Sequence, residues 1–568
     1  MNFKKMSSKS LALIFFAQQL FAEVKTYDIP GGADLKSPDY SVTIANDGKS
    51  HESFVTYSYA LDKYPQWDEY GNMVKEVSMD HKGPQRHSHS IFSFDTPVTV
   101  KVTIHKDAKH ITLPLKSAKV LPSSYNIPCH IENGNTIVFK LNRPEKVAII
   151  PNYDQVWEKF VEMGQSHMPV KSWEQTIGES EKGNKKNITR YMDSLAEGYD
   201  NPLIVSALPL ETEIPDGKMQ KVLSVKPGDK ITEKQMLEYD VVWFKPGLHD
   251  LSTMGRDPYF HTRIKRGQTV YLEGGSYLYA RFMSYHDKEA GPITIMGRGI
   301  ISGLKHSWIH SFSQASLLNN IDRVIGVTIT ERASFSIYNS RLIKDVTLLG
   351  AWHGNNDGPD YSDDTLLENC FMLAHDDNLK LNNNTHAKHI VIWQGTNAHS
   401  IMVKETFRSI PEFANSVVED VDIITYFQDP SRRTEDWARH GMGAIACVTA
   451  MPIAINNFTF KNIRIESPYL YRIFNITNLN SSKINPGWFM KTTDEKHSRI
   501  NGMHFENISI TTPLIGYRSK IWSDYDNSLK NITFKNITVN GVLITDDNKN
   551  DFFEIQENRG QEVTFLNP

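Results

Sequence analysis

The chain has 568 residues, of which 39% are hydrophobic and 23% are charged, and this composition excludes disorder over most of its length. Lys and Arg number 62 and Asp and Glu number 66, so the net charge of −4 lacks the basic field that binding to nucleic acid or an anionic membrane surface needs. We therefore expect no nucleic-acid partner. The length favours two domains, although a long β-solenoid can absorb several hundred residues by itself.

The N-terminus has the pattern of a secretory signal peptide over residues 1–22. Lys4, Lys5 and Lys9 precede an apolar run from Leu11 to Ala17, and Ala22 offers a small residue at the expected cleavage point. The apolar run is too short to span a bilayer, so we expect no membrane insertion. These features predict a soluble, monomeric protein that is secreted or periplasmic.

Residues 23–213 show short segments in which apolar residues alternate with polar ones. Examples are Ser90-Ile-Phe-Ser-Phe and Val98-Thr-Val-Lys-Val-Thr-Ile, and Glu132-Asn-Gly-Asn is a hairpin turn between two such segments. A polar stretch, Gly178-Glu-Ser-Glu-Lys-Gly-Asn-Lys-Lys, interrupts the pattern. This part therefore predicts an N-terminal β-sandwich with a linker.

Residues 214–568 repeat a different unit, a short triad of alternating apolar residues that follows Asn, Asp, His or Gly. The steps between successive triads are 19, 24, 20, 31, 42, 45 and 29 residues. A step near twenty residues is one coil of a parallel β-helix, so the longer steps are coils with inserted loops or contain an unrecognised coil. Four asparagines also match the N-glycosylation pattern, but we favour Asn at a left-handed corner; they are Asn475, Asn507, Asn531 and Asn536. The triads begin at Gly326, Asp345, Asn369, His389, Asp420, Asn462, Asn507 and Asn536.

Three aspartates are expected to converge on neighbouring coils. Asp376 and Asp377 follow Asp357 by 19 and 20 residues, and equivalent positions on successive coils lie about 4.8 Å apart. Clustered carboxylates raise the pKa of at least one member, and an acid beside a base is what glycoside hydrolysis requires. Both adjacent aspartates can face one cleft only if the chain turns or bulges there. Three further aspartates are expected to cap turns or to bind a cation, namely Asp360, Asp363 and Asp364.

The order Asn355-Asn-Asp357-Gly, His375-Asp-Asp-Asn and Ile390-Val-Ile-Trp-Gln resembles glycoside hydrolase family 49, the dextranase and isopullulanase family. The resemblance implies an all-β chain with an N-terminal β-sandwich followed by a right-handed parallel β-helix. It also implies an inverting reaction without a cofactor, in which Asp376 is the general acid while Asp357 and Asp377 position or deprotonate water. The related polygalacturonases add a Gly-His-Gly turn after the aspartates and then an Arg-x-Lys pair. Here the stretch after the aspartates reads Asn397-Ala-His399-Ser, and no Arg-x-Lys pair begins between residues 378 and 517, so a neutral glucan fits better than a polyuronate.

Seven further residues near the aspartates are candidates for substrate binding. The aromatic ones could stack on sugar rings or belong to the core, and the histidines could tune the carboxylates. Lys380 could lower a carboxylate pKa or bind hydroxyls. The seven candidates are Trp352, His375, Lys380, Trp393, Asn397, His399 and Tyr426. His87 and His89 form a possible metal pair on a strand, but no carboxylate or cysteine is nearby, so we predict no metal site.

The sequence thus predicts an exported, endo-acting hydrolase of an α-glucan, with the α-1,6 bonds of dextran as the first choice. An isopullulanase-type cleavage of α-1,4 bonds in pullulan is the second choice. Two readings from other classes stay open: a β-helix polysaccharide lyase, which would release unsaturated products, and a β-helical adhesin or glycan-binding protein, which would release none.

Overall fold

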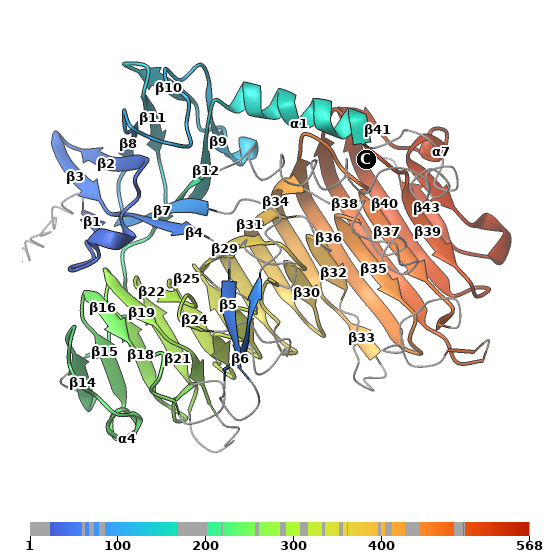
Figure 1. The fold of residues 1–568 in the computed structure, drawn as a ribbon. Helices are drawn as coiled ribbons and strands as arrows, with labels where there is room; N and C mark the ends of the chain where they lie inside the picture. Colours follow the sequence, from blue (N-terminus) through green and yellow to red (C-terminus); the bar gives the residue numbers. More distant parts are fainter. Residues whose placement is uncertain are drawn as a thin grey trace, which may run out of the picture.

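The computed structural model is built almost entirely of strands, arranged as an N-terminal unit and a long array of parallel coils (Figure 1). It describes residues 23–59, 63–67, 73–78, 86–167, 201–216, 218, 220–255, 261–284, 291–306, 316–331, 335–350, 356–360, 362–395, 399–403, 412–426, 443–481, 492–493 and 495–566. The predicted signal peptide lies outside this range. No helix in the described part is long and apolar enough to cross a membrane.

The N-terminal unit contains two main sheets and a hairpin. One sheet has the order β1-β7-β13-β12-β9 with β4 beside β7, and the other has the order β10-β11-β8-β2-β3. The predicted hairpin is confirmed, because Asn133 and Gly134 have positive φ between the antiparallel strands β10 and β11. The elements are β1 (Val24–Thr26), β2 (Tyr40–Asn46), β3 (Lys49–Ser53), β4 (Val55–Tyr59), the hairpin β5 (Lys63–Trp67) and β6 (Met73–Ser78), β7 (Arg86–Phe94), β8 (Val98–Ile104), β9 (Ala118–Leu121), β10 (Cys129–Glu132), β11 (Thr136–Leu141), β12 (Lys146–Pro151), α1 (Tyr153–His167) and β13 (Leu203–Leu208).

The two sheets of the N-terminal unit share one apolar core. Residues that point inward from both sheets, among them Val42, Val100, Phe92 and Val205, form a single buried cluster. Their burial follows from the alternation seen in the sequence, because every second residue of β2 and β8 is buried. The β-sandwich assignment for this unit and the right-handed sense of the coils that follow stay predictions.

The second part is a stack of parallel strands, as the triads predict. A 20-stranded sheet runs along the whole stack, and sheets of four and six strands lie beside it. The large sheet contains β14 (Val222–Val225), β15 (Val241–Phe244), β16 (Gly247–Asp250), β18 (Thr269–Leu272), β19 (Ser276–Tyr279), β21 (Thr294–Gly297), β22 (Ile300–Ser302), β24 (Arg323–Ile325), β25 (Thr328–Thr330), β27 (Leu342–Lys344), β28 (Thr347–Leu349), β29 (Leu366–Ala374), β31 (His386–Gln394), β33 (Glu412–Ala414), β34 (Val417–Tyr426), β36 (Ala454–Glu466), β38 (Arg499–Thr511), β40 (Leu529–Val539), β41 (Val542–Leu543) and β43 (Val563–Leu566).

The smaller sheets close the coils on their remaining side. The four-stranded sheet contains β17 (Thr262–Arg263), β20 (Phe282–Met283), β23 (Leu318–Asn319) and β26 (Ile337–Tyr338). The six-stranded sheet contains β30 (Leu379–Leu381), β32 (Ile401–Val403), β35 (Ile445–Thr449), β37 (Phe474–Asn478), β39 (Ser519–Ser523) and β42 (Phe553–Ile555). Two single-turn helices flank the ends of the stack, α4 (Glu233–Met236) and α7 (Lys549–Phe552).

Each predicted step is the offset between one coil and the next, including the long ones. Thr328 pairs with Thr347 across a step of 19, and Val421 pairs with Ile463 across a step of 42. The same holds for the steps of 24, 20, 31, 45 and 29 residues. The longer steps are therefore single coils with inserted residues, and no coil is missing between them.

A column of left-handed residues marks one corner of the coils. The residue that begins each triad has φ between 53° and 75°, which Asn, Asp and Gly tolerate best. The Asn507 side chain donates to Asn462 Oδ1 at 3.1 Å, and Asn536 donates to Asn507 Oδ1 at 2.8 Å. The corner interpretation of these asparagines is confirmed. Asn475 differs, because it lies in β37 with its side chain buried.

The N-terminal unit and the coils share buried side chains. One core cluster contains Ile150 and Phe160 of the N-terminal unit together with strand residues of the coils such as Trp393. A second cluster joins Ile91 to Tyr277. The two parts are therefore packed together through apolar surfaces and not only through a linker.

Candidate active site

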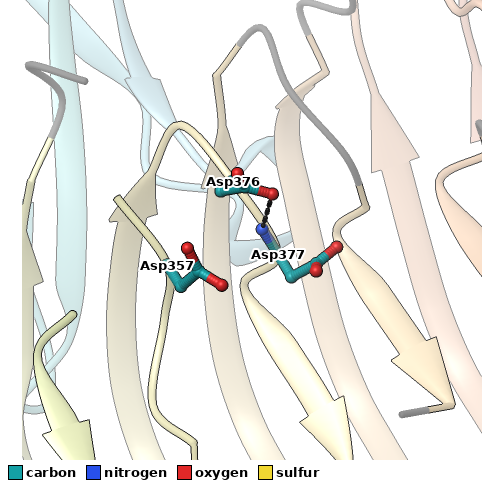
Figure 2. Close-up of side chains that lie close together, drawn as sticks. All are labelled: Asp357, Asp376 and Asp377. Atoms are coloured by element: carbon teal, nitrogen blue, oxygen red, sulfur yellow. Dashed lines mark hydrogen bonds between the residues drawn. The ribbon is translucent and has the colours of Figure 1, made fainter. Parts of the chain in front are cut away.

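The three predicted aspartates meet where one coil passes from the large sheet to the six-stranded sheet. Asp376 and Asp377 lie in a bend between β29 and β30, and Asp357 lies on the preceding coil. The chain turns at this point, which lets adjacent residues face the same site. One carboxylate oxygen of each lies within 4.8 Å of the other two (Figure 2). Asp357 and Asp376 are 5% and 7% exposed, so the group is largely shielded from solvent.

Backbone hydrogen bonds hold the two coils in register at the site. Asp376 N–H donates to the Asn356 carbonyl at 3.3 Å, and Gly358 N–H donates to the Asp377 carbonyl at 2.8 Å. A Cβ at Gly358 would lie 2.0 Å from the Asn378 carbonyl oxygen, so only glycine permits this approach. The glycine after Asp357 therefore sets how closely Asp357 stands to the next coil.

A buried amide supports the bend from the following coil. Gln394, the last residue of β31, donates from Nε2 to the Asp376 carbonyl at 3.0 Å and accepts from Asn378 Nδ2 at 2.7 Å. It is fully buried. The sequence analysis missed Gln394, although its position 18 residues after Asp376 places it close to one coil further on.

Lys380 is the positively charged partner of the cluster. Its ammonium group forms an ion pair and hydrogen bond with Asp357 Oδ2, and the two side chains are 3% and 7% exposed. Burial lowers the pKa of Lys380, but the carboxylates of Asp357, Asp360 and Asp377 outweigh burial and leave the pKa above its ordinary value. Lys380 is therefore a cation over the whole working range of pH.

The two predicted histidines border the same bend. His399 N–H donates to Asp377 Oδ1 at 3.2 Å, and its Nδ1 lies 3.4 Å from the same oxygen. The His375 side chain is buried, and its ring lies against Gly395, where a Cβ would approach Nδ1 to 2.4 Å. His399 thus contacts the carboxylates directly, whereas His375 packs beside the following coil.

The burial of two aromatic candidates corrects the prediction that they bind substrate. Trp393 and Tyr426 are fully buried and belong to the core cluster that also contains Ile150 and Phe160 of the N-terminal unit. An indole or phenol ring without exposed surface cannot stack on a sugar, so the prediction that they bind substrate is wrong. Their burial depends on tertiary packing, which no local pattern records. The candidates Trp352 and Asn397 lie outside the described residues.

The three aspartates expected at turns separate into two kinds. Asp363 and Asp364 are exposed, and Asp364 has a φ of 60°, as expected at a turn. Asp360 is instead 4% exposed, and its negative charge raises the pKa of Lys380. Asp360 therefore belongs to the surroundings of the carboxylate cluster.

Within the described residues, Asp357, Asp376 and Asp377 are the one group of three or more possible metal ligands. Among these residues, a metal ion held by three side chains would use these carboxylates, yet the Lys380 ammonium already supplies positive charge beside Asp357. His87 and His89 are buried, and burial lowers the pKa of each to about 3. His89 Nε2 lies 2.9 Å from Ser206 Oγ, an interaction that is structural.

A surface groove of about 670 Å³ lies at a different corner of the coils, away from the aspartates. Its polar side chains already have partners on the surface: His389 contacts Asp420 at 2.5 Å, Arg464 pairs with Asp420 at 2.5 Å, and Lys388 pairs with Glu368 at 3.0 Å. Those charges are already satisfied, so size alone does not make this groove the reaction site. The aspartate bend is the better candidate on chemical grounds.

Comparison with known proteins finds relatives that are named dextranase and isopullulanase. No family model matches it. The chain is 22% identical over 383 residues to a protein named dextranase from Arthrobacter globiformis, covering 56% of this chain and 58% of that one. It is 23% identical over 389 residues to a protein named isopullulanase from Aspergillus niger, covering 61% and 64%. The matches thus span about three fifths of these relatives.

The solved structure of Dex49A from Penicillium minioluteum superimposes with a TM-score of 0.69 at 16% identity, and the match covers 95% of each chain. The resemblance to glycoside hydrolase family 49 is confirmed. Because the structural match extends over nearly the whole chain, the likeness in fold to Dex49A includes the N-terminal unit as well as the coils.

Proposed function

We propose that the chain is an exported, endo-acting glycoside hydrolase of a neutral α-glucan, with the α-1,6 bonds of dextran as its substrate. The observation that carries the proposal is the cluster of Asp357, Asp376 and Asp377 at one bend, with oxygens within 4.8 Å of one another. Cleavage of a glycosidic bond needs a proton donor for the leaving oxygen and a carboxylate for water, and this cluster offers both in one small volume.

The roles within the cluster follow the family resemblance. Asp376 donates the proton to the glycosidic oxygen, and Asp357 and Asp377 position and deprotonate the attacking water. Two contacts support this division: the ammonium of Lys380 favours the charged form of Asp357, and the N–H of His399 donates to Asp377 Oδ1 at 3.2 Å. A charged, oriented carboxylate is what a general base requires.

The stereochemical part of the proposal, inversion, rests on the family resemblance alone. Acid and base in inverting enzymes are typically about 6.5 to 9.5 Å apart, whereas the closest oxygens of this cluster lie within 4.8 Å. The distance between nearest oxygens is shorter than that between carboxyl groups, so it does not by itself favour retention. Proton NMR of fresh product decides, because inversion at an α-linkage must first release the β-anomer.

Cleavage of α-1,4 bonds in pullulan is the second candidate, and the similarity to the Aspergillus niger isopullulanase supports it. Polyuronates are disfavoured, because no Arg-x-Lys pair begins in the sequence between residues 378 and 517, on the coils that follow the aspartates most closely. Export rests on residues 1–22, and its test is whether those residues are removed from the mature protein.

The deciding experiment incubates the purified protein with dextran, pullulan and polygalacturonate, and measures reducing ends and ultraviolet absorbance. We expect new reducing ends from dextran, a rapid fall in polymer length, and no unsaturated product. Faster release from pullulan would favour the second candidate. Unsaturated products from polygalacturonate would indicate a lyase, and binding without new reducing ends would indicate a glycan-binding protein; either result would refute the proposal.

A further inference from the structure

Lys380 occupies an unusual position for a lysine. It lies in the middle of β30, directly after the bend that carries Asp376 and Asp377, and its side chain is 3% exposed. Its ammonium bonds to Asp357, and it lies 5.3 Å from the centre of the Phe335 ring. Lysines are almost never buried unless a carboxylate compensates the loss of solvation.

The charged and titratable groups around this ammonium are nearly all acidic. Three carboxylates raise the pKa of Lys380, those of Asp357, Asp360 and Asp377. His399 is a further titratable group, and it contacts Asp377. Without Lys380, the carboxylates at this bend would repel one another in a shielded site, and protonation would relieve the repulsion. With Lys380 in place, the Asp357 carboxylate has a positively charged partner that also fixes the orientation of its side chain.

We propose that Lys380 is a positioning residue that holds Asp357 charged and oriented for the attack of water, and that it does not bind substrate hydroxyls. This inference rests on the proposed function and deepens it. A buried ammonium that is bonded to Asp357 has little surface left for a sugar, which distinguishes this role from the substrate contact that the sequence suggested. Lys380 supplies the countercharge that a bound cation would otherwise provide at this cluster.

The test compares Lys380→Met with Lys146→Met. Lys146 is a matched control, because it is also buried, at 2% exposure, but its ammonium donates to the Asn369 carbonyl at 2.7 Å, at the contact between the two parts of the chain. Each variant is assayed on dextran for kcat, KM and the pH profile of kcat/KM, and its unfolding is followed by circular dichroism.

We expect Lys380→Met to lower kcat by about 10²- to 10⁴-fold with little change in KM. The acidic limb of its pH profile should move upward by about one to three pH units, because Asp357 loses an opposite charge. Lys146→Met should lower the unfolding temperature and leave the pH profile in place. In Lys380→Ala, added ethylammonium should restore part of kcat, which a purely structural lysine would not allow.

A Lys380→Met enzyme with the wild-type kcat and pH profile, or one in which only KM rises, would overturn the inference. A double-mutant cycle with Asp357→Asn keeps the inference testable if the single variant is unstable or if no glucan is cleaved. We expect the two substitutions to be strongly non-additive in the free energy of unfolding. Additive effects in an otherwise active enzyme would refute the Lys380 proposal alone, whereas an inactive wild-type protein would refute only the proposed function.

Discussion

Asp376→Asn is the substitution that bears most directly on the proposed mechanism. Asp376 Oδ1 accepts a hydrogen bond from the Asp377 N–H at 3.0 Å, and an asparagine retains this oxygen and nearly the same volume. The bend should therefore keep its shape while the side chain loses its acidic proton. Removal of a general acid typically costs about 10²- to 10⁴-fold in rate, or about 3 to 5 kcal/mol in the barrier.

The assay pairs dextran with an α-glucosyl fluoride substrate. Fluoride needs little protonation to leave, so the loss of Asp376 should be severe on dextran and much smaller on the fluoride. Asp363→Asn is the control, because Asp363 is exposed at a turn of the same coil and should leave both rates unchanged. Near wild-type turnover of dextran by Asp376→Asn, or equal losses on both substrates, would refute the assignment of Asp376 as the acid.

Three further predictions concern the frame of the site and the stability of the fold. Gly358→Ala should reduce turnover sharply while the protein stays folded, because its Cβ would meet the Asn378 carbonyl at 2.0 Å; unchanged kcat would contradict this. Asn507→Ala should lower the free energy of unfolding in urea by about 1 kcal/mol, since its φ is 54°, whereas Asn507→Gly should cost less. Burial lowers the pKa of His89 to about 3, below that of an unfolded histidine. Stability should therefore fall as pH drops from about 6.5 towards 3, with His89 contributing up to about 1.4 kcal/mol per pH unit, and His89→Gln should reduce the slope measured by urea unfolding at a series of pH values.

The sequence predicts the coils well because their architecture is local and periodic. A left-handed corner favours Asn, Asp or Gly, and a buried strand favours β-branched residues. The same residue types therefore recur in the sequence of each coil. Even the step of 45 residues between Asn462 and Asn507 proves to be one coil. The same spacing argument places Asp357 beside Asp376 and Asp377, because neighbours in the stack are one coil apart in the sequence.

The sequence fails where the environment of a residue depends on distant packing. Trp393 and Tyr426 look like exposed aromatics beside acidic residues, but residues of the N-terminal unit join the core in which both lie. Gln394 supports the bend through a carbonyl contact that no residue pattern marks. Asp360 resembles a turn aspartate, and only the burial of Lys380 shows its electrostatic role.

The core shared between the two parts means that the boundary near residue 213 is not a place where the protein can be divided. A chain that began at residue 214 would lack Phe160 and Ile91, which belong to buried clusters that also contain residues of the coils. Apolar surface of this kind drives aggregation when it is uncovered. Deletion, fusion or exchange of the N-terminal unit would thus alter the foldability of the coils.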